Sequence, residues 1–163
     1  MDKAALLDLM AYTDYAWSDI ESSFGSDNEA LVRPAPGSGW PALRNCLAHI
    51  LLGRERWNAA IIERKTIGVP DLADNALRTW GELNAYRAET GSRLASFLAG
   101  LSEADLVAPQ QFDIDGDMLT YSHGDLVLHL VLHEIAHHGD VSTLMYQLGM
   151  EPWVPGYRFH VSP

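Results

Sequence analysis

The stretch SHGDLVLHLVLHEIAHHGDVSTLMYQL, residues 122–148, decides the fold. Its apolar residues recur at steps of three and four, which is the period of an amphipathic helix. Two positions on the same apolar face, where further leucines would suit, are held by His133 and His137. The apolar residues that define this face are Leu126, Leu130, Val141, Leu144 and Leu148.

The two histidines predict half of a metal site. Their i,i+4 spacing places both imidazoles on one side of the helix, about 6 Å apart at Cβ. A single histidine on such a face is usually a hydrogen-bonded core residue, but burying two is unfavourable unless a group such as a divalent cation compensates. His129 and His138 are predicted to be flank or surface residues, and His138 could pair with Glu134 across one turn.

The N-terminal third of the chain predicts two more long helices. Residues 3–24 contain neither Gly nor Pro, and Asp2 suits the N-cap of that helix. Pro41 suits the first position of a second helix over 41–65, which the sequence Gly68-Val69-Pro70 should end.

A third helix and a hairpin follow. Thr79 and Glu82 form a capping-box pattern that opens a helix to about residue 99, with Gly100 suited to its C-cap. Asp115-Gly116 between short apolar runs is a strong hairpin signal.

The start of the last helix and the segments between the helices complete the prediction. Ser122 and Asp125 resemble a second capping box, and Gly149 stops the last helix. Residues 25–39 are rich in Gly and Pro and read as a loop, and the aromatic tail is expected to lie across the bundle. The sequence therefore predicts an all-α fold, a four-helix bundle with a short β-hairpin before the fourth helix, in a single domain over residues 1–163.

Composition limits the classes of function. The chain has 163 residues, a formal net charge of −11 and one cysteine. A strongly acidic chain without a basic patch is not expected to bind nucleic acid. No apolar run approaches the roughly 20 residues of a membrane span, and no signal-peptide pattern is present at the N-terminus, so we expect no membrane partner and a cytoplasmic location.

The best candidate for a third metal ligand is His49, in the middle of the second helix, although its spacing alone fits a helix flank equally well. Three imidazoles suit Zn²⁺ or Ni²⁺, with Fe²⁺ and Co²⁺ as alternatives, and leave an open position, which is typical of catalytic sites. Cys46, one turn before His49, would close the site as a fourth ligand, but a small buried apolar role is commoner for cysteine.

The order of these motifs resembles the DinB-like metalloprotein superfamily. The resemblance is carried by His49 with Trp57 eight residues later, by the hairpin, and by His133-x-x-x-His137-His138-Gly139 before the Leu148-Gly149 stop. It implies a divalent metal on His49, His133 and His137. Many members continue the motif with Arg-Gly-Gln, where this chain has His138-Gly139-Asp140, so a substrate contact from that arginine is lost.

The resemblance also implies a range of activities. Characterised relatives are similar to metal-dependent thiol S-transferases that use bacillithiol or mycothiol, and to mycothiol-dependent isomerases. We therefore expect a His₃-bound metal to activate a low-molecular-weight thiol for attack on an electrophile. Asp140, three residues after His137, could orient that ligand. A homodimer is expected by analogy with the family.

Two other functions remain open at this stage. His133-Glu134-Ile135-Ala136-His137 fits H-E-x-x-H, in which Glu134 would be the general base of a metal-dependent hydrolase, but few residues follow and no strand-rich lobe is expected. The chain could instead be a non-enzymatic metal- or ligand-binding dimeric bundle. An aromatic pocket beside the metal would favour an enzyme, with candidate residues Tyr15, Trp17, Trp57, Trp153 and Tyr157.

Overall fold

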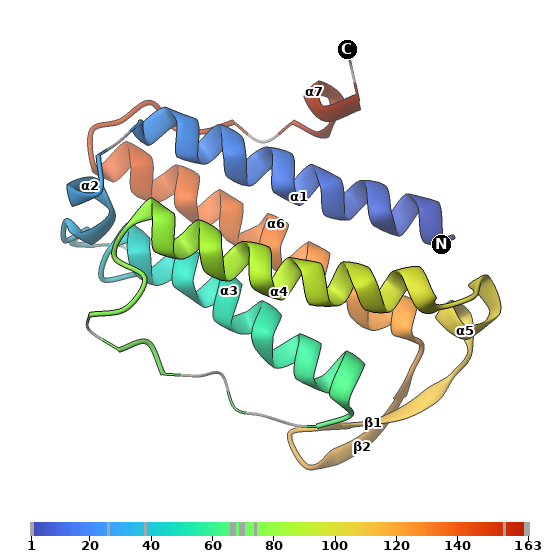
Figure 1. The fold of residues 1–163 in the computed structure, drawn as a ribbon. Coiled ribbons are helices and arrows are strands. Elements are labelled where there is room, and N and C mark those ends of the chain that lie inside the picture. Colours follow the sequence, from blue (N-terminus) through green and yellow to red (C-terminus); the bar gives the residue numbers. More distant parts are fainter. Residues whose placement is uncertain are drawn as a thin grey trace.

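The computed structural model describes residues 2–25, 27–37, 39–65, 68, 71–73, 75–154 and 156–161, and these fold as a four-helix bundle with a β-hairpin (Figure 1). The long helices are α1 (Lys3–Phe24), α3 (Leu43–Asn58), α4 (Trp80–Gly100) and α6 (His123–Gln147). The shorter elements are α2 (Glu29–Val32), the π-helical turn η1 (Ala59–Glu63), α5 (Glu103–Val107), β1 (Gln110–Ile114), β2 (Asp117–Tyr121) and α7 (Tyr157–Val161). The predicted all-α class and the hairpin before the last long helix are confirmed.

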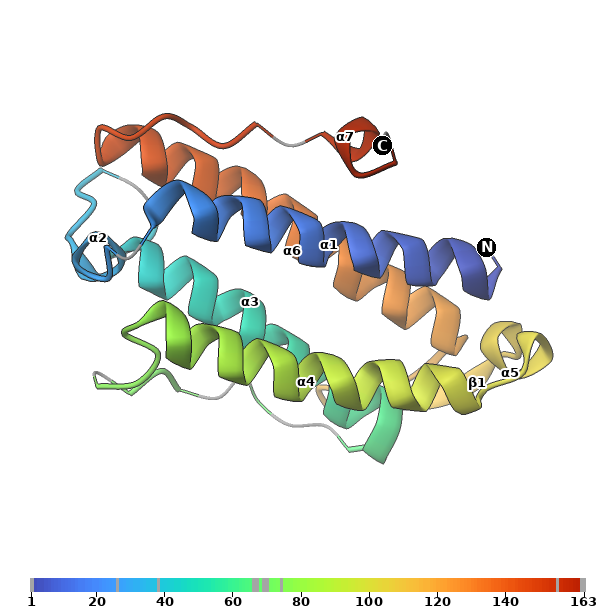
Figure 2. The same ribbon diagram turned by 45° about the horizontal axis from the view of Figure 1, so that its top comes forward.

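The arrangement of the helices is less regular than that of an up-and-down bundle. Helix α3 packs against both α4 and α6, and α1 packs against α6. In Figures 1 and 2, α1 and α6 run in one direction along the bundle, and α3 and α4 run in the other. Because α3 and α4 run in the same direction, the connection between them must span the length of the bundle. Helix α5 and the hairpin instead join the end of α4 to the start of α6 at one end of the bundle (Figure 1).

Local side-chain caps explain where several helices begin. The Asp2 side chain accepts a hydrogen bond from the Ala5 amide at 2.8 Å. Thr79 and Ser122 open α4 and α6 in complete capping boxes, as predicted. Ser102 forms a further box at α5 that the sequence prediction did not include. Each such cap satisfies backbone donors that a helix start otherwise leaves without partners.

The hairpin follows from its turn residues. Strands β1 and β2 pair antiparallel, with Ile114 opposite Asp117 at the turn. Asp115 and Gly116 have φ of 57° and 90°, so both central residues lie in the left-handed region that a type I′ turn requires.

The second helix differs from its prediction at both ends. It begins at Leu43 rather than Pro41, and the loop before it contains the short helix α2. It continues through η1 and ends at Arg64, whose φ of 57° is left-handed. The predicted stop came later along the chain, and its residues Val69 and Pro70 lie outside the described residues.

The buried face of α6 also differs from its prediction. Leu126, Leu130 and Val141 are buried, but the two positions between them on the core side belong to Glu134 and His138, which are 2% and 1% exposed. The prediction that His138 lies at the flank or surface is therefore wrong. Helix α6 is rotated so that His133 and His137 lie at the edge of the core, facing α3, and are only partly buried.

The C-terminal tail lies along the bundle, as expected. The Trp153 indole donates to Asp19 of α1 at 2.7 Å, and the Ser142 hydroxyl of α6 donates to the Trp153 carbonyl at 2.6 Å. The Tyr157 hydroxyl donates to Asp8, which holds α7 against α1 (Figure 2). Within the described part of the chain, no helix combines the length and apolarity needed to cross a membrane.

Candidate metal centre

The structure brings His49, His133 and His137 together, although His133 lies 84 positions after His49 in the chain. Nε2 of His49 and Nε2 of His133 face each other at 3.2 Å. The ring centroids of His133 and His137 are 4.5 Å apart, and those of His49 and His137 are 4.7 Å apart. One donor atom from each histidine lies within 4.8 Å of the other two, which is compatible with one shared cation.

The charge state of these histidines suits a metal. Burial lowers the pKa of His49, and the neighbouring His137 lowers it further. Burial, together with the neighbouring His137 and His49, lowers the pKa of His133 to about 4. Both rings are therefore neutral at pH 7, and only a neutral imidazole has a lone pair to give to a cation.

The Asp140 carboxylate contacts His137, the residue that the sequence analysis expected it to orient. Its Oδ2 lies 2.9 Å from Nδ1 of His137 and accepts a hydrogen bond at 3.1 Å from the indole of Trp40. With Nδ1 donating to the carboxylate, Nε2 of His137 keeps its lone pair for a ligand role. Trp40 also packs against His137 and His49, with ring centroids at 5.5 and 5.1 Å.

The DinB family model matches residues 28–161 of this chain, a segment that contains all three histidines. The chain belongs to the DinB family. A search of curated proteins finds no match. The fold and the His-based candidate metal site together support a DinB-like metal-binding protein.

In this DinB chain, packing rather than a hydrogen bond at Nδ1 positions the His133 ring against α3. Its Nδ1 is buried and has no hydrogen-bond partner among the described residues. Its Cε1 lies against Gly53 of α3, where an added Cβ would come within 3.0 Å. Glycine at this position therefore leaves room for the imidazole between α3 and α6.

Glu134 points away from the three histidines, into a buried ion-pair network. Its carboxylate accepts hydrogen bonds from Arg54 of α3 and Arg87 of α4, each at 2.6 Å. Burial alone would raise the pKa of Glu134, but the two guanidinium groups outweigh it and hold that pKa well below its usual range. The pairing of His138 with Glu134 suggested by the sequence is present as a 3.9 Å contact between its Nε2 and the carboxylate, beyond hydrogen-bond range, so the arginines are the main partners of Glu134.

Cys46 is fully buried within the core cluster, and burial raises the pKa of its thiol well above the ordinary value. Its Sγ is nevertheless close enough to His137 and Asp140 that the three form a second candidate donor group. Its polar contact is a weak 3.8 Å hydrogen bond to the His137 carbonyl. A neutral thiol in these surroundings behaves as a small apolar side chain.

Most of the aromatic residues expected near the metal lie elsewhere. Trp57 packs on the exposed His129, Trp153 packs on His138, and Trp17 lies under Arg87. Among the described residues, Trp40 is the tryptophan whose ring packs on His49 and His137, and the sequence analysis did not select it because it precedes the helix in a Gly- and Pro-rich loop. The one sequence feature that places Trp40 near the second helix is its position directly before Pro41.

Proposed function

We propose that this DinB-family chain binds a divalent cation through His49, His133 and His137 and uses it to activate a low-molecular-weight thiol for attack on an electrophile. The observation that carries the proposal is the convergence of three imidazoles from two helices. A tetrahedral cation with ligands at about 2.0–2.1 Å needs nitrogen atoms about 3.4 Å apart. The 3.2 Å between the Nε2 atoms of His49 and His133 is close to that requirement.

The donor set favours Zn²⁺ or Ni²⁺, since both accept imidazole nitrogen readily. A bound divalent cation would supply Lewis acidity, which lowers the pKa of a thiol and favours its thiolate form. The described residues within reach that could complete the ligand set are Cys46, which is buried and neutral, and Asp140, which is engaged by His137 and Trp40. Three protein ligands would leave a position for a substrate atom.

The chain's own residues hold the ligands and shape access to them. Asp140 fixes the tautomer and orientation of His137 through the 2.9 Å contact to Nδ1. A cavity of about 480 Å³ adjoins Asp140 and is lined in part by Trp40, Asp140 and Leu144, whereas the three histidines lie outside its lining. A mixed wall of indole, carboxylate and aliphatic carbon suits a small polar molecule with an apolar part.

The geometry argues against the H-E-x-x-H hydrolase alternative. A general base must lie within hydrogen-bond reach of the water it deprotonates, directly or through one other water. Both oxygens of Glu134 are held by arginines on the side of α6 away from the metal ligands, and the side chain is 2% exposed.

The test combines elemental analysis with a thiol-consumption assay on the purified protein. Wild type should carry about one divalent metal per chain, and His133→Ala should lose most of it. His129→Ala is the matched control, because His129 lies one turn away on the same helix and is exposed. Asp140→Asn should weaken metal affinity about 10- to 100-fold.

The activity arm uses the metal-loaded protein with a panel of small thiols and electrophiles. Wild type and His129→Ala should consume thiol faster than the metal alone, and His133→Ala should not. Metal at stoichiometric level without thiol consumption would favour a non-enzymatic metal-binding bundle. Equal metal content in wild type and His133→Ala would remove the proposed site altogether.

A further inference from the structure

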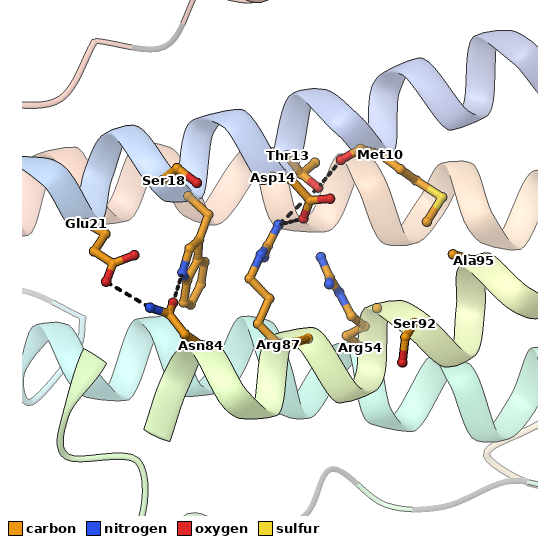
Figure 3. A pocket seen from close by; sticks show the side chains of 13 residues that line it. Met10, Thr13, Asp14, Ser18, Glu21, Arg54, Asn84, Arg87, Ser92 and Ala95 are labelled. Carbon is orange, nitrogen blue, oxygen red and sulfur yellow. Dashed lines mark hydrogen bonds and ion pairs between the residues drawn. The ribbon is translucent and has the colours of Figure 1, made fainter. Parts of the chain in front are cut away.

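A second site lies on the other side of Glu134, between α1 and α4. A cavity of about 560 Å³ opens there, and the guanidinium groups of Arg54 and Arg87 form part of its wall (Figure 3). Both arginines are 7% exposed, which is unusual for a residue that normally lies at the surface. None of the three metal-site histidines lines this cavity.

The buried part of this network lacks one negative charge. Two arginines face one buried carboxylate, that of Glu134, so the buried set carries a net positive charge. An uncompensated buried cation is strongly unfavourable, so the site needs a further anion.

Asp14 supplies that anion from the rim of the cavity. Its Oδ1 accepts from Nη2 of Arg87 at 2.6 Å, yet its side chain is 68% exposed. Arg54 makes no such contact: its one hydrogen bond to a described residue is from Nη2 to Glu134. Its Nη1 lies beside Gly91, where an added Cβ would meet it at 3.1 Å, so that glycine leaves space around the guanidinium.

We propose that this cavity binds a small organic monocarboxylate, whose carboxylate displaces Asp14 from Arg87 and accepts a hydrogen bond from Arg54. Planar guanidinium groups recognise carboxylates through paired, charge-assisted hydrogen bonds. Asp14 occupies in the free protein the place that the ligand carboxylate takes, and it turns toward solvent on binding.

The rest of the lining mixes apolar side chains with small polar ones, and it suits a short aliphatic body with one charge. Met10, Ala88 and Ala95 provide apolar wall. Glu21 lines the opposite end of the cavity from Met10 in Figure 3 and is engaged by the amide of Asn84 at 2.8 Å. A second negative group on the ligand would meet the Glu21 carboxylate, so a dianion is disfavoured.

The experiment titrates sodium butyrate into the ¹⁵N-labelled full-length protein at constant ionic strength. Saturable shifts are expected in the side-chain Nε–H signals of Arg54 and Arg87 and in the indole signal of Trp17, which lies 4.6 Å from the Arg87 guanidinium. Succinate and inorganic phosphate should bind more weakly. Butanol, which has the same chain without the charge, should give no saturable shift.

Two variants with the same change in charge decide the result. Asp14→Asn removes the internal competitor and should tighten butyrate binding about two- to fivefold, as expected for loss of an ion pair whose carboxylate is largely exposed. Asp117→Asn, at an exposed position on β2, should leave the affinity unchanged. The proposal is overturned if wild type shows no saturable shift, if the two variants bind butyrate equally, or if phosphate binds as tightly as butyrate. The readout does not involve the metal, so failure here and failure of the proposed metal chemistry are separate results.

Discussion

Replacing Glu134 with glutamine should destabilise the protein severely, although only one oxygen becomes an amide nitrogen. In the native state each carboxylate oxygen accepts from a different arginine at 2.6 Å, and all three side chains are at least nine-tenths buried. Glutamine can still accept from one arginine through its carbonyl oxygen. Its amide N–H groups would then face the N–H groups of the other arginine, so that no hydrogen bond can form there.

The magnitude follows from this mismatch. Removing one partner of a buried ion pair costs about 3–5 kcal/mol, because the remaining charge is left buried without compensation. The surviving hydrogen bond places the expected loss for Glu134→Gln near the lower end, about 3 kcal/mol of unfolding free energy. That is a large share of the roughly 5–15 kcal/mol by which domains are stable.

The assay is urea unfolding at pH 7, followed by far-ultraviolet circular dichroism. The midpoint should fall, while the dependence of free energy on urea concentration stays the same. Glu89→Gln is the control, since Glu89 lies on α4 close in sequence to Arg87 but is exposed. A loss of less than about 1 kcal/mol, or an equal loss in both variants, would refute the account of the network. A drop in activity of Glu134→Gln has to be corrected for unfolded protein before it is read as catalytic.

Three further outcomes follow from the described contacts. Gly53→Ala should weaken metal affinity at least about tenfold in a competitive chelator titration, because the new Cβ displaces the His133 ring. Helix α3 itself should gain stability from the same change, since alanine favours a helix more than glycine does. Cys46→Ser should leave the metal content unchanged by elemental analysis, since the buried thiol is neutral, and a fall would make Cys46 a ligand. The unfolding free energy should decline as pH falls below about 6.5, because burial lowers the pKa of His123 and the unfolded chain therefore takes up its proton first. His123→Gln should make this dependence shallower in urea midpoints measured from pH 7 to pH 5, and the slope that remains comes from His133 and His138, whose pKa values burial also lowers.

Local signals in the sequence accounted for most of the fold. The caps at Asp2, Thr79 and Ser122 act through neighbouring backbone amides, and the Asp115-Gly116 turn needs only its own φ angles, so each can be predicted without a tertiary structure. The pairing of His133 with His137 is likewise a property of helix periodicity.

The errors concern groups whose burial depends on distant partners. A charged Glu134 is expected at the surface until Arg54 and Arg87 are known to neutralise it from two other helices. The same two arginines stand at buried positions of α3 and α4 where apolar residues are usual, and that sequence pattern indicates a buried ion pair. Trp40 could not be placed beside the histidines, because the path of a loop is not fixed by periodicity.

The neighbouring positions of His133 and Glu134 limit how α6 can change in length. Consecutive helical side chains point about 100° apart, so one backbone step directs the first toward the imidazole cluster and the second toward the buried arginines. Inserting or deleting a single residue between the start of α6 and this step would turn both side chains away from their partners at once. Length variation among sequences that keep both features should therefore be confined to the hairpin, the tail and the interhelical loops, while α6 changes by substitution alone.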